Sequence, residues 1–173
     1  MSASVKVVPY SAEWPALFEA EKQLLQTALS PWMAGEIQHI GSTAVIGLAA
    51  KPVIDIMAPV ASLRESEAAI GAACRVGYVH HPYRAEVMHW FCKPSPKVRT
   101  HHLHLVPFGS QLWLERLAFR DALRASQELA DEYAQLKLRL ATQFAHDREA
   151  YTQAKTPFVQ RVLALVGSRP TWP

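Results

Sequence analysis

The spacing of apolar residues divides the chain into two regions that are expected to fold differently. Up to about residue 107, short stretches alternate polar and apolar positions or run continuously apolar, which is typical of strands, and two stretches with helical spacing interrupt them. Beyond Gly109 the apolar residues recur every three or four positions, as in helices that bury one face. The pattern predicts a mixed α/β core over about 1–107 and a helical part over about 110–166.

Strands and helices are predicted along the whole chain, and the strands all lie in the α/β core. Helices are expected at residues 14–28, 62–75, 110–125, 127–146 and 148–166. Strands are expected at residues 36–40, 51–60, 78–80, 86–93 and 100–107. Because no linker and no internal repeat is visible, we expect a single domain over 1–173. In it, helices flank a small mixed sheet and a C-terminal helical layer covers one side.

Composition and charge narrow the classes of function. The 173 residues are 50% hydrophobic and 19% charged, which suits one compact domain with a single core. The 18 Lys and Arg residues exceed the 15 Asp and Glu residues, and the resulting charge of +3 mildly favours an anionic ligand without a strong signal for DNA. No apolar run approaches the roughly 20 residues that span a bilayer. We therefore expect a soluble, cytoplasmic protein, whose oligomeric state stays open.

One turn and one carboxylate carry the most chemical information. Gly41, Ser42 and Thr43 interrupt a predicted strand, where exposed backbone N–H groups and hydroxyls can hold a phosphate. Asp55 interrupts an apolar strand, so its carboxylate must be paired, hydrogen-bonded, exposed at the strand end or bound to a metal. Both features also have a purely structural explanation, since Gly-Ser turns are common and buried Asp side chains are often hydrogen-bonded in place.

Two histidines on a later strand are candidate metal ligands. His102 and His104 lie two residues apart, so their side chains share one face of the strand. We expect Asp55 and His104 on neighbouring strands and the same face. Imidazoles suit Zn, Mn or Ni better than Mg. The alternative is a polar strand face whose imidazoles hydrogen-bond a loop. Glu86, at the start of the strand 86–93, is a further candidate ligand or a surface strand end.

Basic residues are placed around these candidates. Lys51 and Arg99 each come just before a strand that carries candidate ligands, so both are expected at the rim of a pocket. Arg116, Arg120 and Arg124 recur at every fourth position and form one stripe on a helix, which is ordinarily a solvated face.

The later helices contain two lysines and two tyrosines of interest. Lys137 and Lys155 are either surface lysines or part of a site. Tyr133 and Tyr151 lie among apolar helix positions, so packing is their expected role.

Several stretches together resemble the GrpB family, which belongs to the nucleotidyltransferase superfamily. The resemblance is strongest over residues 39–56, which read His-Ile-Gly-Ser-Thr at the start and Lys-Pro-Val-Ile-Asp-Ile at the end. It continues in the same order through residues 99–106, 119–121, 133–137 and 147–155. The resemblance implies a nucleotidyltransferase-like fold over nearly the whole chain.

The resemblance also implies a type of site. The superfamily motif is a Gly-Ser pair after a strand, an Asp-hydrophobic-Asp/Glu pair further on, and a third carboxylate on a later strand. These carboxylates hold two divalent ions that bridge a nucleotide triphosphate and activate an acceptor hydroxyl. Gly41, Ser42 and Asp55 match this motif, but Met57 stands where the second carboxylate belongs, and a thioether is a poor ligand for Mg²⁺. Either a remote residue completes a mononuclear site or metal-dependent transfer is lost.

The resemblance leaves two main functions open. The first is transfer of a nucleotidyl group from an NTP to an unknown acceptor. The second is a catalytically degenerate domain that binds a nucleotide, coenzyme or metal, with an accessory role near coenzyme A metabolism, because GrpB-like domains also occur fused to dephospho-coenzyme A kinases. A metal hydrolase built on Asp55, His102 and His104 lacks a clear base. In every case the expected partner is a nucleotide or another phosphorylated small molecule.

The expected site has three groups of residues. The catalytic candidates are Asp55, His104 and Lys51. The phosphate-binding candidates are Gly41, Ser42, Thr43, Arg99, Arg120 and Lys137. The metal-ligand candidates are Asp55, His102, His104 and Glu86, for a divalent ion that is Mg²⁺ or Mn²⁺, with Zn²⁺ as a third candidate.

Overall fold

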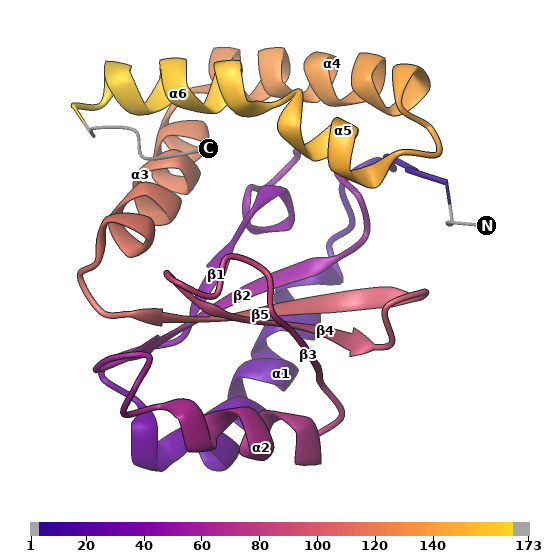
Figure 1. Cartoon of the computed structure of the whole chain (residues 1–173). Coiled ribbons are helices and arrows are strands. Elements are labelled where there is room, and N and C mark those ends of the chain that lie inside the picture. The colour runs from indigo at the N-terminus through magenta and orange to yellow at the C-terminus, as the bar shows by residue number, and fades with distance from the viewer. Residues whose placement is uncertain (1–3, 168–173) are drawn as a thin grey trace.

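A five-stranded mixed sheet lies at the centre of the computed structural model, which describes residues 4–167 (Figure 1). The strands are β1 (Gln38–Ile40), β2 (Ile54–Val60), β3 (Val79–His81), β4 (His89–Pro94) and β5 (Arg99–Pro107). Their order across the sheet is β1-β2-β5-β4-β3. Strands β2 and β5 pair in parallel, and the other three pairs are antiparallel.

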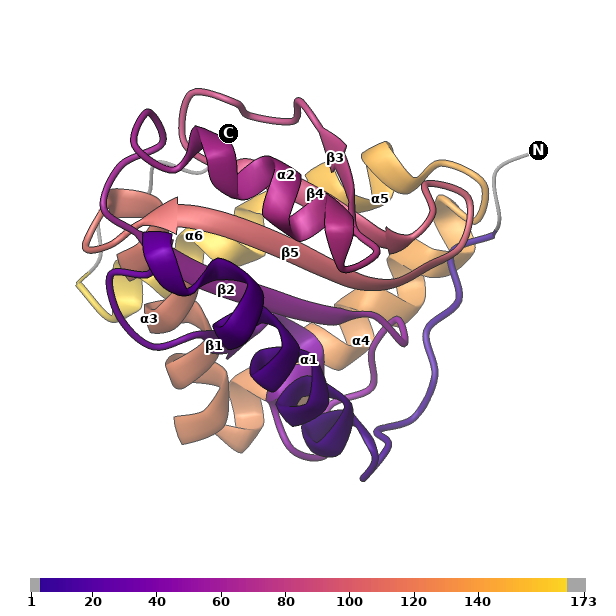
Figure 2. The same ribbon diagram turned by 90° about the horizontal axis from the view of Figure 1, so that it is seen from below.

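Helices cover both faces of this sheet (Figures 1 and 2). One face carries α1 (Trp14–Leu29) and α2 (Glu67–Arg75), which Figure 2 shows in front of the strands. The opposite face is covered by α3 (Gln111–Ala125), α4 (Gln127–Gln143), α5 (Arg148–Gln153) and α6 (Thr156–Leu165). Two short 3-10 helices complete the chain, η1 (Ser30–Trp32) and η2 (Ser42–Ala44).

Alternate residues of the central strands serve opposite faces of the sheet. Ile54, Ile56 and Ala58 of β2 belong to the apolar cluster that packs under α1 and α2, together with Leu103 and Leu105 of β5. The residues between them point to the helical layer, because successive side chains of a strand leave opposite sides of the sheet. Strands β2 and β5 therefore contribute apolar side chains to the core on one face and carry a different set of side chains on the other face.

The first two helices of the helical layer, α3 and α4, each begin with a capping serine. The Ser110 side chain accepts a hydrogen bond from the Trp113 N–H at the start of α3, and the Ser126 side chain accepts one from the Leu129 N–H at the start of α4. Such caps satisfy N–H groups that have no partner within the helix. Within residues 4–167, no helix combines the length and the apolar character that crossing a membrane requires.

The structure confirms the predicted fold class and changes two predicted elements. Residues 148–166 form two helices instead of one. Pro157 lies in the first turn of α6, where its missing N–H is tolerated, although it would break the interior of a continuous helix. The strand predicted at 86–93 begins only at His89, because the chain turns at Arg84, whose φ is 49°. Glu86 consequently lies exposed in that turn and not in a strand.

Candidate metal and anion site

Asp55, His102 and His104 meet on the face of the sheet that the helical layer covers. Asp55 lies directly opposite His102 in the parallel β2–β5 pair, and Met57 lies opposite His104. The His102 Nδ1 atom is 2.9 Å from Asp55 Oδ1, and the His104 Nε2 atom is 3.7 Å from the same oxygen. The prediction that Asp55 and His104 share one face on neighbouring strands is confirmed.

These three side chains form a group that could hold a metal ion. One ligand atom from each lies within 4.8 Å of the others. Ligands bound at about 2.0–2.2 Å around one ion lie at comparable separations from each other. The Nε2 atoms of His102 and His104 are buried and have no hydrogen-bond partner among residues 4–167, which is costly unless something else binds them. The donor set fits a divalent ion that accepts both nitrogen and oxygen.

The protonation states suit metal binding. Burial favours the neutral form of Asp55, but the hydrogen bond with His102 and the nearby His104 imidazole outweigh burial and hold the pKa of Asp55 well below its usual range. Burial lowers the pKa of His104 to about 4, so this imidazole is neutral at pH 7. An ionised carboxylate and a neutral imidazole are the forms that bind metals. At neutral pH no proton therefore has to leave Asp55 or His104 before an ion binds.

Met57 belongs to the core. It is fully buried in an apolar cluster that includes Ile40, Trp90 and Trp113. The imidazole of His104 lies opposite Met57 in register. Its Nδ1 atom contacts the sulfur of Met88 at 3.4 Å. The ligand group thus consists of one carboxylate and two imidazoles on two strands.

The Gly-Ser turn lies against the Asp55 carboxylate. Gly41 has φ 71° and ψ −174°, a conformation that only glycine adopts readily. A Cβ atom at this position would lie 2.6 Å from Asp55 Oδ2, so a side chain there would collide with the carboxylate. Close approach of the turn to Asp55 therefore requires glycine. Ser42 follows, and its hydroxyl accepts a hydrogen bond from Lys137 Nζ at 2.9 Å.

Thr43 has a structural role within the same turn. It is buried, its hydroxyl donates to the Val53 carbonyl at 3.3 Å, and it lies 2.9 Å from the His39 Nε2 atom. Because these contacts occupy the hydroxyl, the predicted role of the Thr43 side chain in phosphate binding finds no support in the structure. His39 stacks on Phe18 of α1, with ring centroids 4.6 Å apart, and so anchors the turn to the other face of the sheet.

Two of the predicted basic residues, Lys51 and Arg120, lie in different surroundings. Lys51 is close enough to Asp55 for the carboxylate to raise the lysine pKa, although burial lowers it overall. Arg120 instead ties α3 to β1, because it donates to the Gln38 side chain at 3.0 Å and to the His39 carbonyl at 3.1 Å. It also pairs with Asp121. Arg120 is therefore a positioning residue.

Arg99 lies at the start of β5. Its guanidinium group lies 5.2 Å from the centre of the Trp90 ring, and its Nε atom donates to the Pro96 carbonyl. Its positive charge contributes to the lowered pKa of Lys51, for which burial is the main cause, so the two residues lie near each other.

The structure changes the expectation for Arg116 and bears on Lys155, whose role the sequence left open. Arg116 was expected on a solvated helix face, but it is partly buried, and its charge acts on Asp55 and His104. Burial lowers the pKa of Lys155 to about 7, and the charges of Lys51 and Lys137 contribute to this shift. Lys155 lies in the family-like stretch 147–155 and was expected to be either a surface lysine or part of a site. No signal in the sequence distinguished Arg116 from Arg124.

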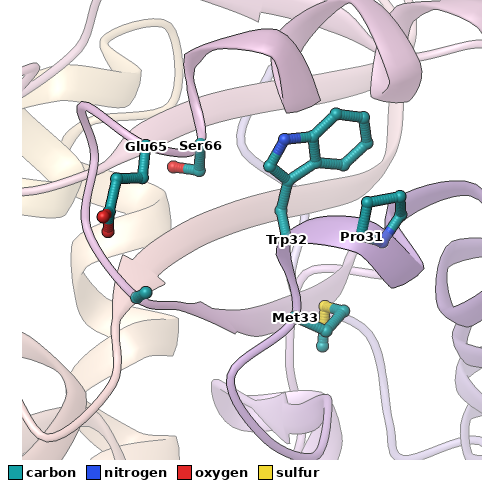
Figure 3. A pocket seen from close by; sticks show the side chains of 6 residues that line it. Pro31, Trp32, Met33, Glu65 and Ser66 are labelled. Atoms are coloured by element: carbon teal, nitrogen blue, oxygen red, sulfur yellow. The ribbon is translucent and has the colours of Figure 1, made fainter.

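A separate shallow pocket lies away from this group (Figure 3). It is lined by Pro31, Trp32, Met33, Ala61, Glu65 and Ser66. Ala61 follows the end of β2, whereas Asp55 is near its start, so the two places are roughly 20 Å apart along the strand. None of the predicted site residues lines this pocket, and it lacks the ligand group that the sheet centre provides.

The fold and the site define an α/β protein with a carboxylate–histidine group at the centre of a mixed sheet. Residues 4–165 match the family described as GrpB protein, and the chain belongs to this family. It is 35% identical over 164 residues to the glutamate-rich protein GrpB of Alkalihalophilus pseudofirmus, covering 92% of this chain and 94% of that protein.

Two further comparisons extend this result. The crystal structure of conserved protein GrpB from Enterococcus faecalis has a TM-score of 0.84 at 31% identity and covers 92% of this chain and 96% of that chain. A dephospho-CoA kinase of Mycolicibacterium paratuberculosis is 39% identical over 79 residues, which are 44% of this chain and 19% of the kinase. The first likeness supports the fold class, and the second extends over less than half of the chain.

Proposed function

We propose that this protein is a metal-dependent nucleotidyltransferase-like enzyme that transfers a nucleotidyl group from an NTP to an acceptor hydroxyl. One observation carries the proposal: the Asp55 carboxylate belongs to the metal-ligand group and also lies against the Gly41-Ser42 turn. A metal ion and a phosphate would therefore be neighbours, which is the arrangement that phosphoryl-type transfer needs.

Each residue has a role in this proposal. Asp55, His102 and His104 hold the divalent ion, which when bound neutralises charge on phosphate oxygens. Asp55 would act as a ligand and not as the base, because a carboxylate with so low a pKa is a weak proton acceptor. Ser42 and Lys137 orient a phosphate at the turn, and Lys51 adds positive charge beside Asp55.

The reaction exchanges a phosphoanhydride bond of the NTP for a phosphodiester bond to the acceptor. The acceptor oxygen forms a bond to the α-phosphorus while the bond from that phosphorus to the bridging oxygen of the β-phosphate breaks. Pyrophosphate leaves with the electron pair of that bond, and the proton of the acceptor passes to water. The lysines and Arg116 lower the cost of the charge that develops on the departing phosphates.

A binding domain without transfer activity is the second candidate function. Burial of Met57 at the second carboxylate position favours it, since one carboxylate cannot hold two Mg²⁺ ions. The partial similarity to a dephospho-CoA kinase adds support for an accessory role near coenzyme A metabolism. Under this alternative the same residues bind a nucleotide or coenzyme, and no bond is broken.

Binding and turnover can be measured side by side. The protein is titrated calorimetrically with each of the four NTPs in the presence of Mg²⁺, Mn²⁺ or Zn²⁺, and pyrophosphate release is followed with water and small alcohols as acceptors. The transferase predicts metal-dependent binding and release, both lost in Asp55→Asn and kept in the surface control Asp131→Asn. Binding without release in every condition would favour the second candidate, and absence of NTP binding would contradict the transferase and leave the second candidate only as a coenzyme-binding domain.

A further inference from the structure

Three lysines from separate elements converge beside the metal-ligand group. Lys51 precedes β2, Lys137 lies on α4, and Lys155 lies between α5 and α6. Lys51 and Lys137 each repel Lys155 strongly enough to help lower its pKa, so the three ammonium groups are close neighbours. Such a concentration of positive charge on partly buried groups destabilises the folded protein unless something of opposite charge binds there.

The three lysines lack carboxylate partners. Among the residues that the structure describes, none of them forms an ion pair with Asp or Glu. The carboxylate that acts on Lys51 and Lys155 is Asp55, which is already engaged by two histidines. An incoming anion would therefore not have to displace a resident carboxylate.

Each of these ammonium groups instead lies over an aromatic ring. Lys51 Nζ and Lys155 Nζ lie 4.8 Å and 4.5 Å from the centre of the Tyr151 ring, and Lys137 Nζ lies 4.7 Å from the centre of the Tyr133 ring. A cation–π contact holds an ammonium group in position and leaves its charge uncancelled. The rings thus preorganise positive charge for a ligand.

A buried hydroxyl points to the same ligand. Tyr151 is fully buried, and its hydroxyl has no hydrogen-bond partner within residues 4–167. A buried hydroxyl without a partner is costly, and native proteins rarely keep one without a reason. The neutral phenol is a hydrogen-bond donor, since burial raises its pKa to about 12. A phosphate oxygen between the lysines would give this donor its acceptor.

We infer that Lys51, Lys137, Lys155 and Tyr151 form a diphosphate subsite that works without the metal ion. Burial lowers the pKa values of Lys137 and Lys155 to about 7, so both are partly neutral in the free protein at pH 7. A diphosphate carries more negative charge than a monophosphate, which has at most about two charges near neutral pH, and would therefore hold the three lysines in their protonated form more strongly. The inference deepens the proposed function and rests on it for the identity of the ligand, which would be the β- and γ-phosphates of an NTP. Inorganic diphosphate has the same chemistry and is the second source to be tested.

The test uses inorganic pyrophosphate as the probe, titrated calorimetrically into the whole chain with EDTA present to remove metal ions. We expect pyrophosphate to bind and orthophosphate to bind about tenfold more weakly or worse. Lys155→Gln should weaken pyrophosphate binding by about tenfold or more, while Lys97→Gln, at an exposed loop position, should leave it unchanged. Equal affinities for the two anions, or a Lys155→Gln variant with wild-type affinity, would overturn the inference.

Tyr151→Phe separates a ligand-binding role from a structural one. The variant keeps the ring under both lysines and removes a hydroxyl that has no partner, so thermal unfolding of the free protein should be unchanged or shifted upward. Its pyrophosphate affinity should nevertheless fall by about threefold or more. A loss of stability with unchanged affinity would show that the hydroxyl has a structural partner and would remove it from the subsite.

Asp55→Asn distinguishes failure of this inference from failure of the proposed function. In EDTA this variant should bind pyrophosphate at least as tightly as wild type, because it removes the negative charge beside the lysines. Metal binding should be lost in the same variant. ATP that displaces bound pyrophosphate assigns the subsite to a nucleotide, and ATP that does not displace it assigns the subsite to inorganic diphosphate. Absence of pyrophosphate binding to wild type would overturn the inference while leaving the metal titration to judge the transferase.

Discussion

The two faces of the sheet are built from the same strands and differ in the polar side chains that they carry. On the face under α1 and α2, Ile54 and Ile56 of β2 pack with Leu103 and Leu105 of β5 in a dry apolar core. On the other face, Asp55 lies between those isoleucines in the sequence and meets histidines of β5. The Asp55 side chain is 29% exposed, while Ile56 is completely buried.

This difference shows how a small protein positions reactive groups. The apolar face fixes the register of β2 and β5, since a slip of one residue would turn every apolar side chain away from the core. That same register determines which side chains meet on the other face. Side chains on the apolar face therefore determine stability, and side chains on the other face provide the candidate ligands, while the shared backbone fixes both sets in place. Substitutions on one face should mainly change stability, and substitutions on the other should mainly change metal binding.

The largest effect on stability is expected on the apolar face. Ile56→Ala removes a fully buried side chain and leaves a cavity, so the free energy of unfolding should fall by about 2–5 kcal/mol. Metal affinity should stay close to the wild-type value under conditions where the variant is folded. Urea unfolding and calorimetric Zn²⁺ titration measure the two quantities. If metal affinity fell together with stability, a substitution on the apolar face would also disturb the ligand group on the other face.

Met57→Asp adds a second carboxylate to β2 on the site face. In the absence of metal, a buried charge beside Asp55 should lower the free energy of unfolding by about 3 kcal/mol. Affinity for Mg²⁺ should rise, because the site gains a hard oxygen ligand. Met57→Leu is the control and should cost less than about 1.5 kcal/mol without changing metal preference. An unchanged ratio of Mg²⁺ to Zn²⁺ affinity in Met57→Asp would place the ion away from this position.

Gly41→Ala tests the contact between the turn and Asp55. The added Cβ would lie 2.6 Å from the carboxylate, in a backbone conformation that alanine adopts at a cost of about 1–3 kcal/mol. Both the free energy of unfolding and metal affinity should fall. Gly47→Ala is a matched control with φ 80° and open space around the position, so it should lower stability without affecting metal binding. Equal metal affinities in the two variants would contradict the proposed contact.

The smallest effect concerns pH and the lysines of the helical layer. Burial lowers the pKa of Lys137 to about 7, and burial with the charges of Lys51 and Lys137 lowers that of Lys155 to about 7. In the unfolded chain both are near 10.4. Between these values the unfolded state binds more protons, so the free energy of unfolding should rise with pH above 7. From pH 7 to pH 8 we expect a gain of about 1 kcal/mol for each lysine, or about 2 kcal/mol for the two together.

Urea unfolding at the two pH values measures this gain. Lys137→Met should reduce it, because one of the two titrating groups is removed. Saturating pyrophosphate should also reduce it, since a bound anion favours the protonated lysines in the folded state. A stability that falls between pH 7 and pH 8 in the free protein would contradict the lowered pKa values.

The sequence predicts much of the site face but not the long-range contacts that decide individual roles. Alternation along two strands was enough to put His102 and His104 on one side and to pair them with Asp55. The hydrogen bonds of Arg120 reach Gln38, 82 positions away, and therefore could not be foreseen from spacing. The same limit explains why Thr43 was expected at a phosphate.

Strand boundaries and helix breaks show a second limit of the sequence. The single helix expected at 148–166 is interrupted before Pro157, although proline gives a local signal at that position. Glu86 was placed on a strand because its neighbours are apolar, and the turn at Arg84 overrides that pattern. Local propensity decides such positions only where tertiary packing agrees with it.

The place of β5 in the sheet has a consequence for how the protein is made. This strand is the last of the five to leave the ribosome, yet it lies in the middle, between β2 and β4. Until residues 99–107 emerge, β2 carries an unpaired edge that can associate with other chains. His102 is 47 positions from Asp55, so a nascent chain that ends before β5 has no complete metal-ligand group. An ion held by this group would therefore bind only after residues 99–107 have been made and could not help to start formation of the sheet.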